Sequence, residues 1–312
     1  MIGRAPGYRR AVKFSAWPAA DRNWNDVLEL AQWAEQHGWY GVWVADHYMP
    51  NTGTEEVGDG PTNECWAYLA ALAATTSTVR IGPLVSPTTV HHPALLANRA
   101  ATTDIISNGR FVLGLGAGWQ INEHRAYGID LLDAGARVTR FAEAIEIVHS
   151  MLRQPRTTFA GEHFQITDAP CDPKPIGDVP IVVGSKGPRM LGIIARFAQE
   201  WNCWGNPQAT ATSVSLLDAA CEQAGRDPST MHRSAQAMIV FADTPDDHSG
   251  VDPVFADRTI AGTPEQIAEQ IVAYEPQGFG EFILPDFWEI NDLGHKRELY
   301  ERFVTEVVPL VG

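Results

Sequence analysis

The sequence has few basic residues for its size and lacks a long apolar run. Lysine and arginine number 23 against 38 aspartate and glutamate, so the formal net charge is −15 at pH 7. That charge repels the phosphates of nucleic acids and of anionic membranes, and we expect neither as a partner. No apolar run reaches the ~18 residues of a membrane span. Residues 1–10 are basic, but no apolar stretch follows them, which predicts a loose lead-in rather than a secretory signal.

Cysteine is also scarce, and its spacing argues against a metal site. The four cysteines lie far apart, with no CxxC pair and no histidine at ligand spacing: Cys65, Cys171, Cys203 and Cys221. The adjacent His91 and His92 would point different ways in a strand or loop, so they do not favour a shared metal either. We therefore expect reduced thiols, no metal and a cytoplasmic location.

The common nucleotide-binding and hydrolase motifs are missing as well. Residues 184–187 (GSKG) lie between an expected strand and an expected helix, but they lack the GxxxxGK[ST] spacing of a P-loop. The nearest approach to GxGxxG is residues 114–118, which follow the fourth expected strand instead of the first. Ser185 is not part of a GxSxG turn, which argues against a hydrolase triad.

What the sequence does contain is a regular alternation of short apolar runs and longer amphipathic stretches. A chain of 312 residues that is 45% hydrophobic suits one large domain, without disulfide or metal support. The expected strands are residues 11–17, 41–45, 79–85, 111–115, 181–183, 200–203, 235–241 and 281–284. The expected helices are residues 24–37, 64–76, 93–106, 137–152, 188–198, 211–224, 264–274 and 296–308.

Eight strand–helix units imply parallel strands joined by crossovers. They match an α/β fold of the closed (β/α)8 TIM-barrel type better than the alternative, a doubly wound open sheet, and we expect a single domain over residues 1–312. The loops at 48–60 and 244–258 are polar insertions, and residues 157–166 have the glycine-centred pattern of a hairpin.

In such a barrel the functional residues follow the C-terminal ends of the strands. These positions are Asp46-His47, Ser86-Pro87-Thr88, Gly116-Ala117-Gly118-Trp119, Gly184-Ser185-Lys186-Gly187, Asn202 and Pro285-Asp286. The Asp46-His47 pair is the most informative of them, because a histidine titrates near neutrality and can move a proton. The aspartate can orient it or bind a ring nitrogen of a heterocycle. A polar pair that only caps the next turn is the alternative.

Two glycine-containing turns and a set of tryptophans are the next candidates. Residues 116–118 (GAG) allow backbone to approach a flat ligand, although a plain tight turn explains them as well. Residues 184–187 precede a helix that starts near Pro188, where free N–H groups and Lys186 can form an anion site; an ordinary turn is the alternative. Several tryptophans lie near strand ends, and we expect two or three of them to line a pocket for a planar cofactor. They include Trp17, Trp43, Trp66, Trp119, Trp201, Trp204 and Trp288.

Five segments together resemble the luciferase-like flavin and deazaflavin oxidoreductases. In order they are residues 38–50 (GWYGVWVADHYMP), 79–129, 180–202, 261–271 (AGTPEQIAEQI) and 281–287 (EFILPDF). The resemblance covers residues 11–310 and is closest to the branch that uses coenzyme F420, a 5-deazaflavin that carries hydride. The chain is more distantly similar to the deazaflavin-dependent glucose-6-phosphate dehydrogenases.

The resemblance implies a role for each matching residue. Asp46 contacts the deazaflavin ring, and His47 lies near its reactive C5 as a proton donor or anion stabiliser. Leu84, Val85 and Ser86 form a bulge behind the ring with a non-prolyl cis peptide, and Ser86 makes a polar contact to the cofactor. The remaining cofactor contacts are Ala117, Gly118 and Asn122, and the phosphate-binding turn with Gly184, Ser185, Lys186, Gly187 and Arg189.

One departure from the related sugar-phosphate dehydrogenases bears on the substrate. Those enzymes have a glutamate directly after the GxG as a proton acceptor, and this chain has Trp119 there. We therefore expect no oxidation of glucose 6-phosphate, and a more apolar substrate pocket that includes Trp43 and Trp119.

The expected function is hydride transfer between C5 of the deazaflavin and a small organic substrate with a C=C, C=O or C=N bond. The first alternative is an FMN-dependent monooxygenase on the same barrel, because FMN also carries a phosphate. The second is a flavin-binding or storage protein without activity, although such a protein has no need of a titrating group beside the ring. The family likeness also implies a homodimer.

Overall fold

The computed structural model describes residues 12–245, 250–287 and 293–312. Three parts of the sequence prediction lie outside the described residues. They are the expected lead-in at residues 1–10, residues 246–249 of the expected loop at 244–258, and Trp288.

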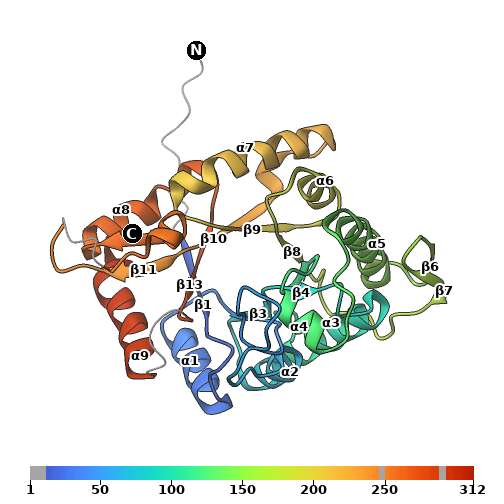
Figure 1. Cartoon of the computed structure of the whole chain (residues 1–312), viewed down its shortest axis with the longest axis horizontal. Coiled ribbons are helices and arrows are strands. Elements are labelled where there is room, and N and C mark those ends of the chain that lie inside the picture. The colour runs from blue at the N-terminus through green and yellow to red at the C-terminus, as the bar shows by residue number, and fades with distance from the viewer. Residues whose placement is uncertain (1–11, 246–249, 288–292) are drawn as a thin grey trace.

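Eight parallel strand positions close into the barrel that the alternation predicts (Figure 1). The sheet has the order β3-β2-β1-β13-β10-β9-β8-β5-β4. Its two end members, β3 and β4, follow each other in the chain and together make one interrupted strand of the barrel. The strands are β1 (Lys13–Trp17), β2 (Gly41–Val44), β3 (Arg80–Pro83), β4 (Ser86–Pro87), β5 (Leu113–Gly116), β8 (Ile181–Gly184), β9 (Glu200–Trp204), β10 (His232–Gln236) and β13 (Glu281–Pro285). The ring closes where Ile81 of β3 pairs in parallel with Phe111.

Glycine allows this closure. A Cβ atom on Gly82 would lie 2.1 Å from the carbonyl oxygen of Val112, and one on Gly114 would lie 1.9 Å from that of Pro83. The backbones of β3 and β5 therefore approach more closely than any larger residue permits. The Val112 N–H donates to the Ile81 carbonyl at 2.9 Å across the same seam.

Helices cover the outside of the barrel, as Figure 1 shows. They are α1 (Trp24–Gln36), α2 (Cys65–Thr75), α3 (Pro93–Ser107), α4 (Ile121–Ala126), α5 (Ala134–Arg153), α6 (Pro188–Phe197), α7 (Pro207–Gln223), α8 (Pro264–Val272), α9 (Leu293–Arg302) and α10 (Val308–Val311). Helix α4, a short helix in the loop after β5, was not predicted from the sequence. At α8 the Thr263 and Gln266 side chains form a capping box, which fixes the helix start at Pro264.

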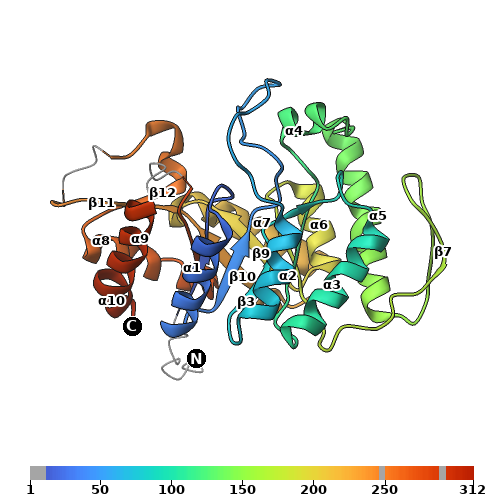
Figure 2. The same ribbon diagram turned by 90° about the horizontal axis from the view of Figure 1, so that it is seen from below.

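Smaller elements decorate the barrel. The expected hairpin is present as β6 (Thr157–Ala160) and β7 (Gln165–Ala169), which project beside α5 (Figure 2). The strand expected at 235–241 is divided in two: its first residues end β10, and the rest form β11 (Met238–Phe241). β11 pairs in parallel with β12 (Thr259–Gly262), outside the barrel sheet. Residues between these two strands were expected to be a loop, and the described part of them includes a 3₁₀ turn at Pro253–Arg258.

The side chains of the strands alternate between two buried layers. One large cluster fills the space between strands and helices, with Val42, Leu113 and Ile181 among its fully buried members. A second cluster fills the interior of the barrel: Trp17, Trp43, Leu84, Val112, Val182 and Ile283. The structure thus corrects the expected role of Trp43, which is 2% exposed inside the barrel and does not reach the pocket described below.

A group of charged residues closes the N-terminal end of the barrel. Glu281 is buried and accepts hydrogen bonds from Ser15 Oγ at 2.6 Å and Trp43 Nε1 at 3.0 Å, while His232 Nε2 lies 2.9 Å from its other oxygen. Glu200, His232 and Glu281 place ligand-type atoms within 4.8 Å of one another. Arg80 forms ion pairs with both carboxylates, however, so its guanidinium supplies the positive charge that a metal would supply.

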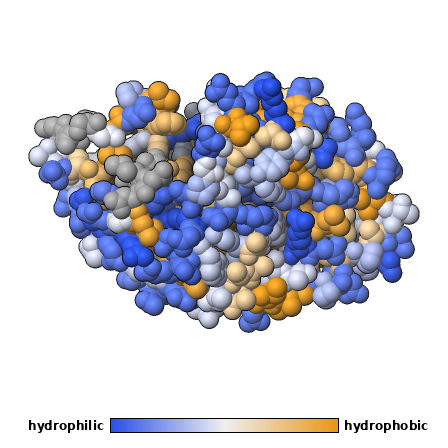
Figure 3. All heavy atoms as spheres, turned by 60° about the horizontal axis from the view of Figure 1, so that its bottom comes forward, coloured by the Kyte–Doolittle hydropathy of each residue, from blue (hydrophilic) through white to orange (hydrophobic). Residues whose placement is uncertain are grey.

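The surface is mainly hydrophilic on the face shown in Figure 3, and the cysteines form no disulfides. On the face shown in Figure 3, hydrophilic residues predominate and hydrophobic ones are scattered between them. No helix in the described part of the chain is long and apolar enough to cross a membrane. All four cysteines are free and buried, and burial raises the pKa of the Cys203 thiol to about 11.

Candidate active site

A cavity of about 1070 Å³ opens at the C-terminal ends of the barrel strands. This is the end at which (β/α)8 barrels carry their active sites. Nine of the residues given a cofactor, catalytic or substrate role line it: His47, Leu84, Val85, Ala117, Gly118, Trp119, Gly184, Ser185 and Lys186. The strand-end candidates Pro87, Gly116 and Asn202 line it as well. The volume is large enough for a tricyclic cofactor and a small substrate together.

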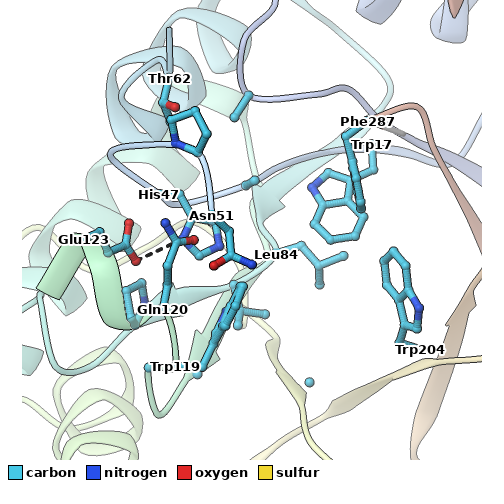
Figure 4. A pocket seen from close by; sticks show the side chains of 18 of the residues that line it. Trp17, His47, Asn51, Thr62, Leu84, Trp119, Gln120, Glu123, Trp204 and Phe287 are labelled. Atoms are coloured by element: carbon cyan, nitrogen blue, oxygen red, sulfur yellow. Dashed lines mark hydrogen bonds and ion pairs between the residues drawn. The ribbon is translucent and has the colours of Figure 1, made fainter. Parts of the chain in front are cut away.

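A histidine and a glutamate form the polar centre of this cavity (Figure 4). The Nδ1 atom of His47 lies 3.0 Å from Oε1 of Glu123, and the other oxygen of Glu123 accepts the Tyr48 N–H at 3.0 Å. The Glu123 side chain is 3% exposed and that of His47 is 26% exposed. Since Nδ1 is held by the carboxylate, Nε2 is the nitrogen left to meet a ligand.

Sequence reasoning missed Glu123. It lies on α4, one residue after the predicted Asn122, and that adjacency was the available signal. Its position depends on a short helix that has few apolar residues, which is why the periodicity did not reveal it.

Asp46 lies directly behind the cavity wall rather than on it. It is 1% exposed, and its Oδ2 accepts from Ser86 Oγ, from Trp66 Nε1 at 3.2 Å and from His91 Nε2 at 2.9 Å. The second oxygen, Oδ1, is buried with no partner among the described residues. Ser86 does not line the cavity either, so these two predicted cofactor contacts form a buried network beside it.

The bulge between β3 and β4 forms the floor of the cavity. The peptide bond between Leu84 and Val85 is cis, as the resemblance implies, and both residues line the cavity. Val85 packs against β5 so closely that a Cβ on Gly116 would lie 2.6 Å from its Cγ2. Gly116 is therefore required for packing of the bulge, in addition to its place in the lining.

The turn after β8 leads into the start of α6. Gly187 is the N-cap residue of α6, Pro188 is its first residue, and no side chain caps its first-turn N–H groups. The Lys186 ammonium group donates to the Trp204 carbonyl at 2.5 Å and remains at the cavity wall. Uncapped N–H groups and a lysine are the components of an anion site.

Gly187 and Arg189 themselves do not line the cavity. Arg189 is exposed and reaches the start of α5, where it donates to Thr139 Oγ1 at 3.2 Å. Asn122 is also elsewhere than predicted: it is fully buried and donates to the Pro50 carbonyl at 2.8 Å. It holds the loop after β2 and does not reach the cavity lining.

Aromatic residues form the opposite wall. Trp17, Trp204 and Phe287 lie together across the cavity from His47 and Trp119 (Figure 4). Three of the tryptophans considered in the sequence, Trp17, Trp119 and Trp204, therefore line the cavity. The other strand-end carboxylate, Asp286, is buried in an ion pair with Arg22 at 2.6 Å and is not part of the lining.

Comparison with known proteins places this barrel in a family. Residues 10–250 match the family model described as luciferase-like monooxygenase, which is more than half of the chain. The chain therefore belongs to the luciferase-like family.

Curated relatives carry more specific names. An F420-dependent glucose-6-phosphate dehydrogenase from Kineococcus radiotolerans is 30% identical over 223 residues, which is 70% of this chain and 65% of that protein. An F420-dependent hydroxymycolic acid dehydrogenase from Mycobacterium tuberculosis is 30% identical over 221 residues, or 70% of this chain and 59% of the relative. The matched region thus spans slightly less than two thirds of these relatives.

Solved structures confirm the fold. An F420-dependent secondary alcohol dehydrogenase in complex with an F420-acetone adduct superposes with a TM-score of 0.80 at 20% identity, covering 96% of this chain and 99% of that one. EDTA monooxygenase from Chelativorans sp. BNC1 superposes with a TM-score of 0.78 at 15% identity, covering 97% and 93%. At such low identity the likeness defines the barrel and does not distinguish the two activities.

Proposed function

We propose that this protein is a coenzyme F420-dependent oxidoreductase. The bound deazaflavin supplies hydride chemistry at C5, and the substrate is a small organic molecule with a C=O, C=C or C=N bond. The observation that carries the proposal is the His47–Glu123 pair, which faces a cavity built on the Leu84–Val85 bulge in a luciferase-like barrel. The names of the 30% identical relatives support F420 over other flavins.

The residues of the cavity fit such a cofactor. The bulge and the residues 116–118 provide a wall with little side-chain bulk, against which a flat ring can lie. A Cβ on Gly184 would have the Asn202 amide oxygen as its nearest neighbour, at 3.7 Å, so the wall is also open at the end of β8. Beyond it the uncapped start of α6, with Ser185 and Lys186, suits the phosphate group of the cofactor.

The chain's own contribution to the reaction centres on His47. Its Nδ1 is held by Glu123, so its Nε2 can hold a proton toward the substrate or accept one from it. The Glu123 carboxylate balances the positive charge that the ring carries when it is doubly protonated. Trp17, Trp204 and Phe287 give the cavity an aromatic wall opposite this histidine.

The test is titration of the purified protein with coenzyme F420 and, separately, with FMN, followed by fluorescence. Micromolar binding of F420 with weak binding of FMN is the expected result. Tight binding of FMN together with oxygen consumption would overturn the proposal in favour of a monooxygenase. Binding of neither compound would overturn the cofactor assignment altogether.

Two further properties belong to this proposal. We place the protein in the cytoplasm, because all four cysteines are free thiols, the form that a reducing compartment maintains. We also propose a homodimer, on the likeness of the chain to the luciferase-like family. Sedimentation velocity at micromolar concentration tests the dimer, and a single species of about 34 kDa would exclude it.

A further inference from the structure

Two cationic side chains meet at one residue of the cavity wall, and we call them the cationic pair: Lys186 and Arg258. The Lys186 ammonium group donates to the Trp204 carbonyl at 2.5 Å, and the Cζ atom of Arg258 lies 6.0 Å from the centroid of the Trp204 ring. Both cationic residues are exposed and line the cavity. The pair therefore brings two positive charges to the end of β9, beside the aromatic wall.

Backbone contacts fix where the pair stands. The arginine ends the 3₁₀ turn at Pro253–Arg258, and the Asn206 N–H ties this turn to the residues after β9 by donating to the Asp257 carbonyl at 2.8 Å. Gly205 lies between the two cations. A Cβ atom on Gly205 would lie 3.6 Å from Lys186 Nζ and 3.2 Å from the Asp257 carbonyl oxygen, and its φ of +145° also favours glycine. The lysine and the arginine turn thus pack on the same glycine.

Neither member of the pair has an acidic partner in the part of the chain that the structure describes. Their contacts there are a backbone carbonyl and an aromatic face. Other arginines do have carboxylate partners, for example Arg22 with Asp286 and Arg80 with Glu200. The chain has 38 acidic and 23 basic residues, so acidic side chains are not scarce. Two unpaired cations at a cavity wall are typical of a site that receives its negative charge from a ligand.

The acidic residues that line the described cavity stand elsewhere. Glu123 is held by His47, which lies across the cavity from the aromatic wall (Figure 4). Asp21 lies 3.3 Å from the Lys296 ammonium group, and Asp59 belongs to the loop after β2. An anion at the end of β9 therefore meets two positive charges that no ion pair among the described residues neutralises.

The proposed phosphate site of the cofactor has donors and a cation of its own. It lies at the uncapped start of α6, and Arg189 joins this helix to the start of α5 by donating to Thr139 Oγ1 at 3.2 Å. Arg137, in the first turn of α5, lines the cavity as well. Arg258 instead lies over the ring of Trp204, which belongs to the aromatic wall. A phosphate at the start of α6 thus leaves this arginine available for a second anion.

We infer that the cationic pair is an anion subsite, and that the substrate carries a carboxylate or phosphate group on an apolar body. The inference rests on the proposed function and narrows its substrate to organic anions. The Arg258 guanidinium can form two parallel hydrogen bonds with either anion, and Lys186 adds a point charge. Trp204 and Phe287 stack at 5.7 Å and 27°, which gives the apolar body an aromatic wall to lie against. Figure 4 shows these rings across the cavity from His47, so the rest of the molecule can extend from the pair toward the histidine.

The first experiment measures the binding of benzoate, phenyl phosphate and neutral benzamide to the F420-loaded protein by ligand-observed NMR titration. The three probes share an aromatic ring and differ in charge. We expect at least one of the two anions to bind about tenfold more tightly than benzamide, the scale of one hydrogen bond to a charged group. The tighter anion identifies which of the two groups the subsite takes. Benzamide that binds as tightly as both anions, or binding of neither anion, would overturn the inference.

Two variants then assign this binding to the pair. Arg258→Gln keeps a polar side chain and removes the charge, and we expect the Kd of the preferred anion to rise about tenfold while that of F420 stays within about twofold. Lys186→Gln should raise both Kd values, because the lysine also lies next to the proposed phosphate site. Arg196→Gln removes an exposed charge of α6 outside the cavity, so it is the control and should change neither value.

The same titrations separate the possible failures. An Arg258→Gln variant that binds the preferred anion as the wild type does would overturn the inference. If that variant also loses affinity for F420, the arginine belongs to the cofactor site instead. If the wild-type protein binds no F420, the proposed function fails, and titration of the F420-free protein with the three probes still reports whether the cationic pair binds an anion.

Discussion

His47 and Glu123 are 76 positions apart in the sequence, yet the Nδ1 of the histidine lies 3.0 Å from the carboxylate oxygen Oε1. The carboxylate is anchored by the Tyr48 N–H at 3.0 Å, which belongs to the residue after the histidine itself. The imidazole is therefore held by its own loop and by α4 at the same time. This double anchoring fixes which ring nitrogen faces the cavity.

Replacing the Glu123 charge should therefore lower turnover without emptying the cofactor site. We expect Glu123→Gln to reduce kcat by about tenfold to a hundredfold, because the amide keeps the shape and loses the charge that supports a protonated imidazole. Steady-state kinetics and an F420 titration on the same sample measure this. Glu56→Gln, an exposed glutamate in the loop after β2, is the matched control. A Glu123→Gln variant with wild-type kcat would show that the pair only shapes the loop.

Removing the imidazole itself should have a larger effect. We expect His47→Ala to lower turnover ~10²- to 10⁴-fold, the usual scale for loss of a general acid, while the Kd for F420 changes little. A fluorescence titration with F420 on the same sample is the second readout, because it separates loss of proton transfer from loss of the cofactor. A variant that turns over at the wild-type rate would exclude His47 as the proton donor.

The barrel could be predicted because each of its signals is local. Short apolar runs, their alternation with amphipathic stretches and the Thr263 cap are all visible within about ten residues of sequence. The break between β3 and β4 was not visible in this way. Residues 79–85 are apolar apart from Arg80, and the interruption comes from the bulge at Leu84–Val85, which packs on Gly116 from another strand.

The predicted residues that line the cavity follow strand ends, although Asp46 and Ser86 also follow strands and do not line it. His47, Trp119 and Lys186 follow strands directly, and all three line the cavity. The prediction that Trp43 lines the substrate pocket was wrong. The alternation of side chains along a strand predicts that Trp43 faces the interior of the barrel, but it does not predict how deep the side chain lies. It is two residues below the rim residue Ala45, where it donates to Glu281.

The aromatic wall of Trp17, Trp204 and Phe287, and the pairing of Glu123 with His47, could not be predicted from the sequence for a different reason. Their members come from elements that are distant in the chain, and only the closed barrel brings them together. Trp17 and Phe287, for example, are 270 positions apart but have ring centroids at 5.0 Å. A single sequence contains no information on such pairings beyond the fold itself.

Two side chains at the start of helix α4 hold the loop after β2 by donating to the carbonyl groups of two successive loop residues. Gln120 donates to the Met49 carbonyl at 2.9 Å and Asn122 to the Pro50 carbonyl at 2.8 Å. Figure 2 shows this loop and α4 standing next to each other above the barrel. We expect Asn122→Ala to release the loop, because the part-buried Pro50 carbonyl loses its partner.

The expected result of Asn122→Ala is local. Amide hydrogen exchange in residues 48–62 should accelerate, and the KM for substrate should rise, because Met49, Pro50 and Asn51 line the cavity. Exchange in the barrel strands should not change. Asn98→Ala on α3, whose side chain only bonds the Ala94 carbonyl within its own helix, is the control. Unchanged exchange in the loop would refute the role of Asn122 as its anchor.

Glu281, at the opposite end of the barrel, should make stability depend on acid. Burial would raise the pKa of this carboxyl, but the hydrogen bond to His232 and the charge of Arg80 outweigh it, so its pKa is lowered from the usual 4.5. A carboxyl whose pKa is lower in the folded state binds protons more readily when unfolded. Its contribution to stability is therefore full above pH 4.5 and is lost as the pH falls through the folded-state pKa.

We expect Glu281→Gln to be about 3–5 kcal/mol less stable than the wild type at pH 7, since Arg80 and His232 lose a buried partner. The variant should also lose less stability than the wild type between pH 5 and pH 3, because it lacks the group that titrates. Urea unfolding at pH 7, 5, 4 and 3 measures both effects, with the exposed Glu222→Gln as control. Equal losses of unfolding free energy on acidification in wild type and variant would mean that other carboxylates control acid unfolding.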